Sequence, residues 1–160
     1  MSDTEIETLW SFIRRSIDRI FSCLEGLGEE DLNWRPLRNA NSLYILATHV
    51  MANVESNILG VLCGLEILRN RDDEFKARGS SSEPLQKKWQ ELQEKISINL
   101  SKLPPGALNQ EYVHPRLGRI TGRDHFIVIA RHIAEHVGHS ELTRDLLFTA
   151  LGRELPAREF

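Results

Sequence analysis

Four of the six histidines of this chain fall in one C-terminal segment, at His125, His132, His136 and His139. At about 100° per residue, all four would share one face of a helix. His132 and His136 are four residues apart, so their rings would stand one turn apart and could bind one ion. His125 would lie about 10 Å along the axis from His132, too far to share that ion. The spacing therefore predicts that His132 and His136 form part of a metal site.

A third ligand is expected from another helix, because catalytic divalent metals commonly have three protein ligands and one open position. His49 lies in an otherwise apolar run, residues 43–50. A neutral imidazole there needs partners for both ring nitrogens, of which a metal would satisfy one and a carboxylate or carbonyl the other. Three imidazoles suit zinc, nickel, copper or iron better than magnesium or calcium. The predicted cofactor is one divalent transition metal, zinc or nickel first, held by His49, His132 and His136.

Other interpretations of these residues stay open. The three rings could form a hydrogen-bonded cluster in the core, without a metal. Residues 132–136 also match H-x-x-E-H, the inverted-zincin protease motif, in which Glu135 would activate a metal-bound water. Proteases of that class are several times longer and take a third ligand well downstream, for which this chain offers only poor candidates. Glu135 is our catalytic candidate as a base beside the ligands, and a surface ion pair with Arg131 or Arg144 is its alternative.

Further residues are predicted close to the site. Asn53 and Ser56 continue the helix face of His49 and could orient a bound water or a substrate. Hydrogen bonds across the fold are the alternative for both side chains. Trp34 is expected to pack at one end of the helices and to line a pocket.

Several polar features are predicted to be solvated instead. The acidic run at residues 72–74 lacks the alternating oxygen ligands and the glycine of a calcium loop, so a solvated linker is expected. His114, beside a proline, is expected to be exposed. Arg116 and three other arginines could bind a carboxylate-bearing thiol, with solvated side chains as the alternative; the other three are Arg35, Arg119 and Arg123.

The elements that must position these residues follow from apolar periodicity. Steps of three and four between apolar residues predict four long helices, at about residues 6–24, 42–68, 84–103 and 123–151. A short extended pair is expected around residues 112–113 and 119–120. The predicted fold is all-α, a four-helix bundle with long crossover connections, which we expect before the second and fourth helices. Residues 1–152 would form a single domain and residues 153–160 a C-terminal tail.

Composition bounds the function. A chain of 160 residues with 41% apolar and 27% charged residues fits one folded domain. The net charge of −3 shows no basic excess, so neither nucleic acid nor an anionic membrane is expected as the main partner. The apolar segment 42–68 carries too many polar groups for a lipid-exposed span. An acidic start without a secretory pattern predicts a cytoplasmic protein, in which Cys23 and Cys63 are buried, reduced thiols.

Three stretches of the sequence resemble the DinB-like (DinB/YfiT) family of metalloenzymes. They are the connector at residues 30–36, the helix entry at residues 41–49, and the segment 132–139 with residues 144–147 after it. The resemblance implies a four-helix bundle in which His49, His132 and His136 bind the metal. It places His139 close to the site without making it a ligand.

The resemblance also implies an activity. Relatives resemble thiol-dependent transferases or isomerases that use bacillithiol, mycothiol or glutathione, so a low-molecular-weight thiol and a small-molecule substrate are expected. The metal would stabilise the thiolate of that thiol, or would activate water for hydrolysis. A non-catalytic metal-binding or stress-response module is the alternative. Relatives often dimerise, so a homodimer is a further expectation.

Overall fold

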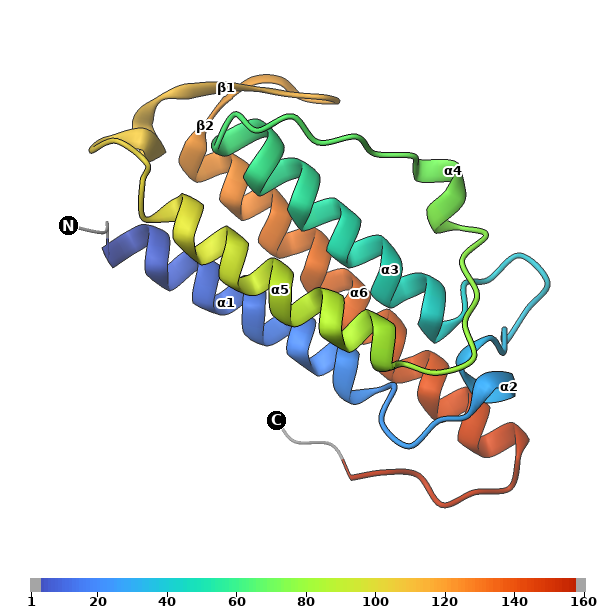
Figure 1. Ribbon diagram of the computed structural model, residues 1–160. Coiled ribbons are helices and arrows are strands. Elements are labelled where there is room, and N and C mark those ends of the chain that lie inside the picture. Colours follow the sequence, from blue (N-terminus) through green and yellow to red (C-terminus); the bar gives the residue numbers. More distant parts are fainter. Residues whose placement is uncertain (1–3, 158–160) are drawn as a thin grey trace.

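The computed structural model describes residues 4–157 of the chain, and it is mostly helical (Figure 1). The long helical segments are α1 (Thr4–Ser22), α3 (Leu43–Val54) with its π-helical continuation η1 (Glu55–Leu62), α5 (Glu83–Leu100) and α6 (Gly122–Ala150). The shorter elements are α2 (Glu29–Leu32), α4 (Arg71–Glu74), the 3-10 turn η2 (Ala107–Asn109), β1 (Glu111–His114) and β2 (Gly118–Thr121). The mainly helical class is confirmed, with one small sheet added. The ends of the predicted domain and tail, residues 1–3 and 158–160, lie outside the described residues.

The long segments pack side by side around one continuous apolar core. In Figure 1, α1 and α6 run in one direction, and α3 and α5 run in the opposite one. Ile13, Leu46, Ile58 and Ile133, which come from three of these segments, are all fully buried in that core. Burying a side chain of this size contributes about 1.5–3 kcal/mol each, so the shared core holds the helices that carry the histidines in register.

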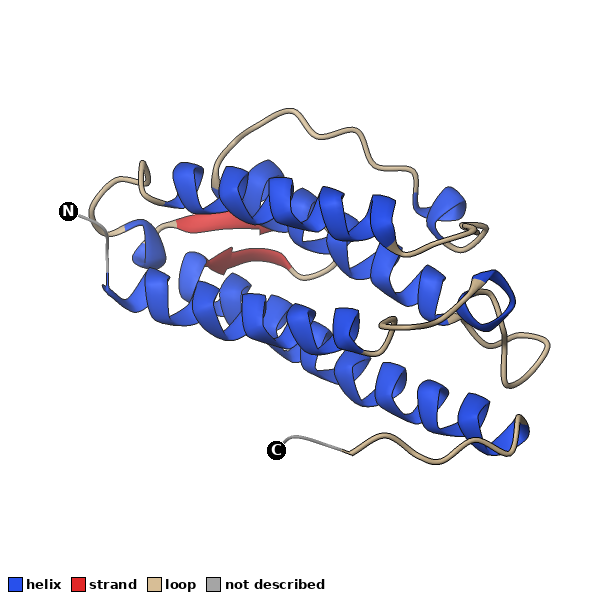
Figure 2. Cartoon of the chain, turned by 60° about the horizontal axis from the view of Figure 1, so that its bottom comes forward, coloured by secondary structure: helices blue, strands red, loops and turns tan. Residues whose placement is uncertain are grey.

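A long connection before α5 runs back along the helices. Residues 63–82, here called the strap, leave η1 at one end of the molecule and pass along α3 to the start of α5 at the other end (Figures 1 and 2). The connections before α3 and α6 instead turn at the ends of the molecule. These turns agree with our expectation that the connections before the second and fourth helices cross an end. The full-length return before α5 was not predicted, and it is needed because α3 and α5 are parallel.

The second helical segment is shorter than its apolar pattern suggests. It begins as predicted at Ser42, whose hydroxyl accepts a hydrogen bond from the Ile45 amide at 3.2 Å. It ends at Leu62 rather than Leu68, since Gly64 adopts a left-handed conformation with φ of 70°. Leu68 is 94% exposed, so the apolar residues beyond the glycine do not continue the buried face.

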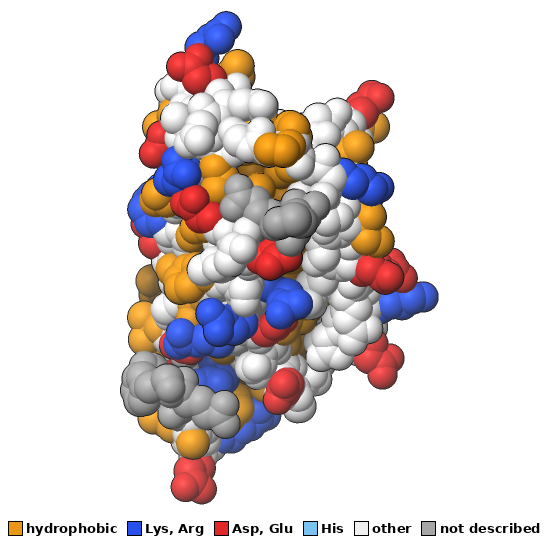
Figure 3. Space-filling view, turned by 90° about the vertical axis from the view of Figure 1, so that its left-hand side faces the viewer, with side chains coloured by type: hydrophobic (Ala, Val, Ile, Leu, Met, Phe, Trp, Pro, Cys, Tyr) orange, Lys and Arg blue, Asp and Glu red, His pale blue; other side chains and the backbone are white. Residues whose placement is uncertain are grey.

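The segment Leu43–Leu62 is long and apolar enough to cross a membrane, judged by length and composition among the described residues. Of its most apolar window, 61% is buried inside the protein. The neighbouring helices cover it, as they would cover the core helix of a soluble protein. On the face drawn in Figure 3, acidic and basic side chains are interspersed with apolar ones.

The extended pair predicted between the third and fourth long helices is confirmed. β1 and β2 form an antiparallel hairpin in which Tyr112 pairs with Ile120 and Val113 pairs with Arg119. It precedes α6, whose first turn is capped by the hydroxyl of Thr121, an acceptor from the Asp124 amide at 3.1 Å. The base of the hairpin thus lies at the start of the helix that carries His132 and His136.

The far end of the strap is fixed by a reciprocal contact with the connector after α1. The side-chain amide of Asn33 donates to the Gly79 carbonyl at 2.8 Å, and its oxygen accepts from the Gly79 amide at 3.3 Å. A Cβ atom on residue 79 would overlap the ring of Tyr44, so only glycine fits this close approach. The connector segment that resembles the DinB-like family therefore has a structural task, which is to hold the strap against α3.

Candidate metal centre

The three predicted ligands converge in the structure. His49 comes from α3, and His132 and His136 stand one turn apart on α6. Each offers one ring nitrogen, and these atoms all lie within 4.8 Å of one another. The Nε2 atoms of His49 and His132 are 3.1 Å apart. His49 is buried and the other two rings are half-buried, so the three imidazoles meet at the boundary between the core and a cavity.

The second nitrogen of His49 is held by a carboxylate from the strap. Nδ1 of His49 lies 2.8 Å from Oε2 of Glu74, which is itself only 5% exposed. Glu74 in turn accepts two hydrogen bonds from Arg69, at 2.6 and 3.0 Å. A carboxylate on Nδ1 places the ring proton there and leaves the Nε2 lone pair facing the other histidines.

The prediction that the acidic run at residues 72–74 is a solvated linker was wrong for Glu74. Asp72 and Asp73 are exposed as expected, but Glu74 is buried because α4 turns it toward α3. The side chain of Asn70 caps this short helix by accepting from the amides of Asp72 and Asp73. Two signals could have pointed to Glu74: a capping residue before the run, and the need of His49 for a carboxylate partner.

The electrostatics keep the three rings neutral, as metal ligands must be. Burial, together with the smaller effect of neighbouring histidines, lowers the pKa of His136 to about 3 and that of His132 to about 4. Burial also lowers the pKa of His49, although Glu74 opposes this shift. Burial by itself would raise the pKa of Glu74, but hydrogen bonds from Arg69 and His49 outweigh it and lower that pKa, so the carboxylate is charged.

The donor set fits a transition-metal ion. In tetrahedral coordination with metal–nitrogen bonds of about 2.0–2.1 Å, neighbouring ligand nitrogens lie about 3.3 Å apart. The 3.1 Å between Nε2 of His49 and Nε2 of His132 is close to that value. Nδ1 of His136 is buried and makes no hydrogen bond within the protein. The donor types and their separation therefore fit a transition metal.

A cavity of about 370 Å³ opens beside these rings, and its wall includes His132, Asn53 and Ser56. Its volume is in the range of small-molecule sites. The Oδ1 atom of Asn53 is buried and makes no hydrogen bond within the protein. The two polar residues predicted on the face of His49 thus line the same cavity as one of the candidate ligands.

Comparison with known proteins places the chain in a family. A family model described as mycothiol-S-transferase matches residues 8–148. The chain belongs to this DinB-like family. A comparison with curated proteins gave no match.

Two crystal structures are similar to this family member. A conserved protein from Enterococcus faecalis has a TM-score of 0.74 at 14% sequence identity, covering 93% of this chain and 99% of that one. A DinB-like protein from Bacillus cereus ATCC 10987 has a TM-score of 0.72 at 15% identity, covering 99% of this chain and 98% of that one. At these identities the likeness shows a shared fold.

Glu135 pairs with an arginine on the surface of α6 in this mycothiol S-transferase family member. Its side chain is 57% exposed, and its carboxylate accepts a hydrogen bond from Arg131 one helical turn away, at 2.7 Å. This is the surface ion pair that the sequence left as an alternative. A base must come within hydrogen-bond reach of the group that it deprotonates, so the contacts of Glu135 favour the ion pair over catalysis.

The other residues expected near the site are placed differently from one another. His139 is exposed, and its ring stacks on that of His136 at a centroid distance of 5.8 Å. Trp34 is half-buried against the apolar core, and it is not among the residues that line the cavity at the histidines. His139 is therefore a neighbour of a candidate ligand, whereas Trp34 packs the end of the fold.

His125 and His114 contact each other, at a ring-centroid distance of 5.2 Å. His125 is fully buried, and its Nε2 atom lies 3.2 Å from the backbone oxygen of Asn57. His114 is half-buried and lines the cavity, so the expectation that it is exposed was wrong. The hairpin folds it over the start of α6, a contact that spacing along one helix does not reveal.

Both cysteines are free thiols, as predicted, and Cys23 is buried, whereas Cys63 is only half-buried instead of buried. Burial raises the pKa of Cys23 and that of Cys63 to about 11 each, so both stay protonated at neutral pH. A protonated thiol is a poor nucleophile, and neither cysteine suits nucleophilic catalysis.

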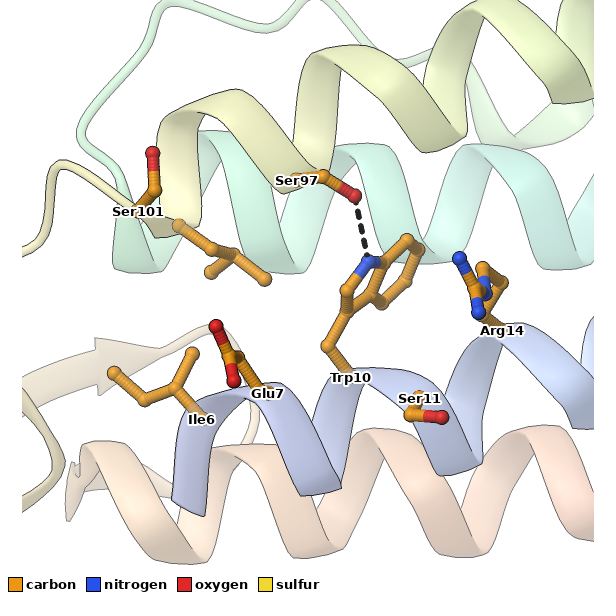
Figure 4. A pocket seen from close by; sticks show the side chains of 8 residues that line it. Ile6, Glu7, Trp10, Ser11, Arg14, Ser97 and Ser101 are labelled. Atoms are coloured by element: carbon orange, nitrogen blue, oxygen red, sulfur yellow. Dashed lines mark hydrogen bonds between the residues drawn. The ribbon is translucent and has the colours of Figure 1, made fainter. Parts of the chain in front are cut away.

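A second cavity, of about 260 Å³, lies between α1 and α5 (Figure 4). Trp10 projects into this space, where its indole N–H donates to the hydroxyl of Ser97 at 3.0 Å. Its wall combines apolar side chains with serine hydroxyls and contains no histidine. The metal-ligand chemistry of the described residues is therefore concentrated at the cavity between α3 and α6.

Proposed function

We propose that this chain is a divalent-metal-dependent S-transferase or isomerase that uses a low-molecular-weight thiol, with His49, His132 and His136 as the metal ligands. The observation that supports the proposal best is the convergence of three neutral imidazoles from two helices beside a cavity. The name of the family, mycothiol-S-transferase, supports thiol chemistry. When bound, zinc or nickel would lower the pKa of a thiol or water and so favour the nucleophilic form at neutral pH.

The residues of the chain have separate tasks in this proposal. Glu74 orients His49 through Nδ1, and Arg69 holds Glu74 in turn. Asn53 and Ser56 present polar atoms to the cavity for orienting a small molecule. The nucleophile comes from outside the chain, because both cysteines are protonated.

The proposed reaction forms one bond from the thiol sulfur to an electrophilic carbon. In a transfer, the bond from that carbon to the leaving group breaks, and the leaving group keeps the bonding pair. The proton of the thiol passes to water. The substrates are small molecules, and we place the reaction in the cytoplasm, within a four-helix bundle formed by α1, α3 with η1, α5 and α6.

Metal content tests the first half of the proposal. Protein purified without a histidine tag and dialysed against zinc or nickel is expected to bind one ion per chain, measured by elemental analysis. His132→Ala is expected to lose that ion, with its helical content by circular dichroism unchanged. A wild-type chain that stays metal-free under these conditions would contradict the metal site.

Turnover tests the second half. The metal-loaded chain is incubated with a panel of low-molecular-weight thiols and electrophilic substrates, and thioether formation is followed by mass spectrometry. We expect turnover that is lost in His132→Ala. Stoichiometric metal binding without turnover across the panel would instead favour the non-catalytic metal-binding or stress-response module.

A homodimer stays a prediction. Several large apolar side chains on α1 and α6 are exposed, among them Phe12, Ile127, Leu142 and Leu146. Light scattering measures the mass of the particle directly. A particle of the monomer mass, 18.4 kDa, would remove the dimer from the proposal.

A further inference from the structure

The wall of the cavity beside the histidines is strongly basic. Four arginines line it: Arg69 and Arg71 from the strap, Arg116 from the hairpin turn and Arg131 from α6. The lining contains neither aspartate nor glutamate. Three separate segments of the chain thus direct positive charge at one small volume, which favours an anionic occupant.

Two of these arginines have their charge matched within the protein. Arg69 is bound to Glu74 at 2.6 Å, and Arg131 is bound to Glu135 at 2.7 Å. Arg71 and Arg116 form no ion pair with any described carboxylate. The guanidinium of Arg71 lies over the Phe75 ring, 5.5 Å from its centre, and this cation–π contact positions the side chain. The unmatched charge therefore belongs to Arg71 on the strap and to Arg116 on the hairpin, two segments that line the same cavity.

A second observation adds a different requirement. Oδ1 of Asn53 is a buried acceptor without a partner, and Asn53 lines the same cavity. A buried acceptor of this kind calls for a donor, such as an amide or ammonium N–H. His132, one of the candidate metal ligands, lies in the same wall. A ligand that satisfies all three features carries a carboxylate, an N–H donor and a group that reaches the histidines.

We propose that the thiol used by this chain is a carboxylate-bearing thiol of the cysteinyl-peptide type, whose carboxylate is bound by Arg71 and Arg116 and whose N–H is bound by Asn53. The inference rests on the proposed function, since it assigns the sulfur to the end of the cavity at the histidines. Guanidinium groups bind carboxylates through charge-assisted hydrogen bonds. A thiol without an acidic group, such as mycothiol, leaves both arginines unmatched, so it is the poorer substrate.

Binding of a non-reactive analogue tests the subsite without any turnover. Isothermal titration of S-methylglutathione into the zinc-loaded chain is compared with titration of its diethyl ester, which lacks both carboxylates. We expect the acid to bind about tenfold to hundredfold more tightly than the ester. The double variant R71Q/R116Q is expected to remove that difference. R119Q is the matched control, because Arg119 lies on the same hairpin as Arg116 and is not part of the cavity wall.

The outcomes separate the subsite from the function. Equal binding of acid and ester, an unchanged double variant, or no binding of S-methylglutathione would each overturn the subsite. Arginine-dependent binding without turnover of any thiol would leave the subsite standing and contradict the transferase. If mycothiol is turned over at least as fast as glutathione, and if R71Q/R116Q does not change these rates, the transferase is supported and this inference is overturned.

Discussion

The carboxylate of Glu74 lies 2.8 Å from Nδ1 of His49, and through this contact the strap reaches the candidate metal centre. The two residues are 25 positions apart in sequence and belong to different elements. Both are buried, and Arg69 completes a chain of hydrogen bonds behind them. The orientation of a candidate ligand thus depends on a segment outside the long helices.

Replacing Glu74 by glutamine is expected to lower zinc affinity tenfold to hundredfold, because Nδ1 of His49 would lose its charged partner. Competition with a chromophoric chelator measures the change. Asp73→Asn is the control, since Asp73 is exposed on the same helical turn. Equal affinities of the wild type and Glu74→Gln would show that the carboxylate does not orient the ligand.

His136→Ala and His139→Ala are expected to differ sharply. His136 belongs to the convergent group of ring nitrogens, whereas His139 only stacks on it from the solvent side. The first variant should lose stoichiometric metal, and the second should keep one ion per chain by elemental analysis. A loss of metal in His139→Ala would mean that the ion is held by a different set of rings.

Glu135→Gln is expected to change kcat by less than about twofold. The carboxylate is exposed and paired with Arg131, so removing its charge should cost little more than a surface ion pair, about 0–1 kcal/mol in stability. Steady-state kinetics of the metal-loaded variant measure the effect. A hundredfold loss of kcat with unchanged metal content would restore Glu135 as the catalytic base.

Gly79→Ala is expected to destabilise the chain by about 1–3 kcal/mol, because the added methyl group would overlap the Tyr44 ring. Urea denaturation gives the free energy of unfolding. Gly28→Ala is the matched control, since a Cβ there meets no atom within 4 Å. If both variants are equally stable, the strap can shift without loss of contacts.

The metal-free chain is expected to lose stability as the pH falls from about 6.5 toward 4. Burial, together with the charge of His114, lowers the pKa of His125 in the folded chain to about 4. Between pH 6.5 and 4, His125 therefore binds a proton in the unfolded chain but not in the folded one, which favours unfolding. The loss is about 1.4 kcal/mol per pH unit for one such group. Urea denaturation at pH 7 and pH 5 should show a smaller change for His125→Gln than for the wild type. An equal change in both would mean that His125 is already protonated in the folded chain.

The parts of the site that share a helix could be predicted from the sequence. His132 and His136 meet because helical geometry alone sets the direction of residues four apart. His49 could be predicted because a lone imidazole in an apolar run needs partners, and both of them exist in the structure. Local rules of this kind carry over directly from sequence to structure.

The parts that depend on chain path could not be predicted. Glu74 lies in a polar segment whose composition is typical of a solvated linker, and only the route of the strap along α3 buries it. The end of the second helical segment was missed for a related reason, since the apolar pattern continues past Gly64 although the helix does not. Periodicity reports which residues favour burial but not where the backbone turns.

The residues of the site come from two kinds of structure, the long helices and the strap. The helices supply the three imidazoles from within the core, whereas the strap supplies Glu74 and Arg71 from outside it. Exchanging Arg71 alone for an acidic residue would spare the contacts of Arg69 and Glu74 with His49 and would reverse one of the charges that line the cavity. Within the strap, this exposed position is therefore the place where the choice of small molecule could change without disturbing the candidate ligands.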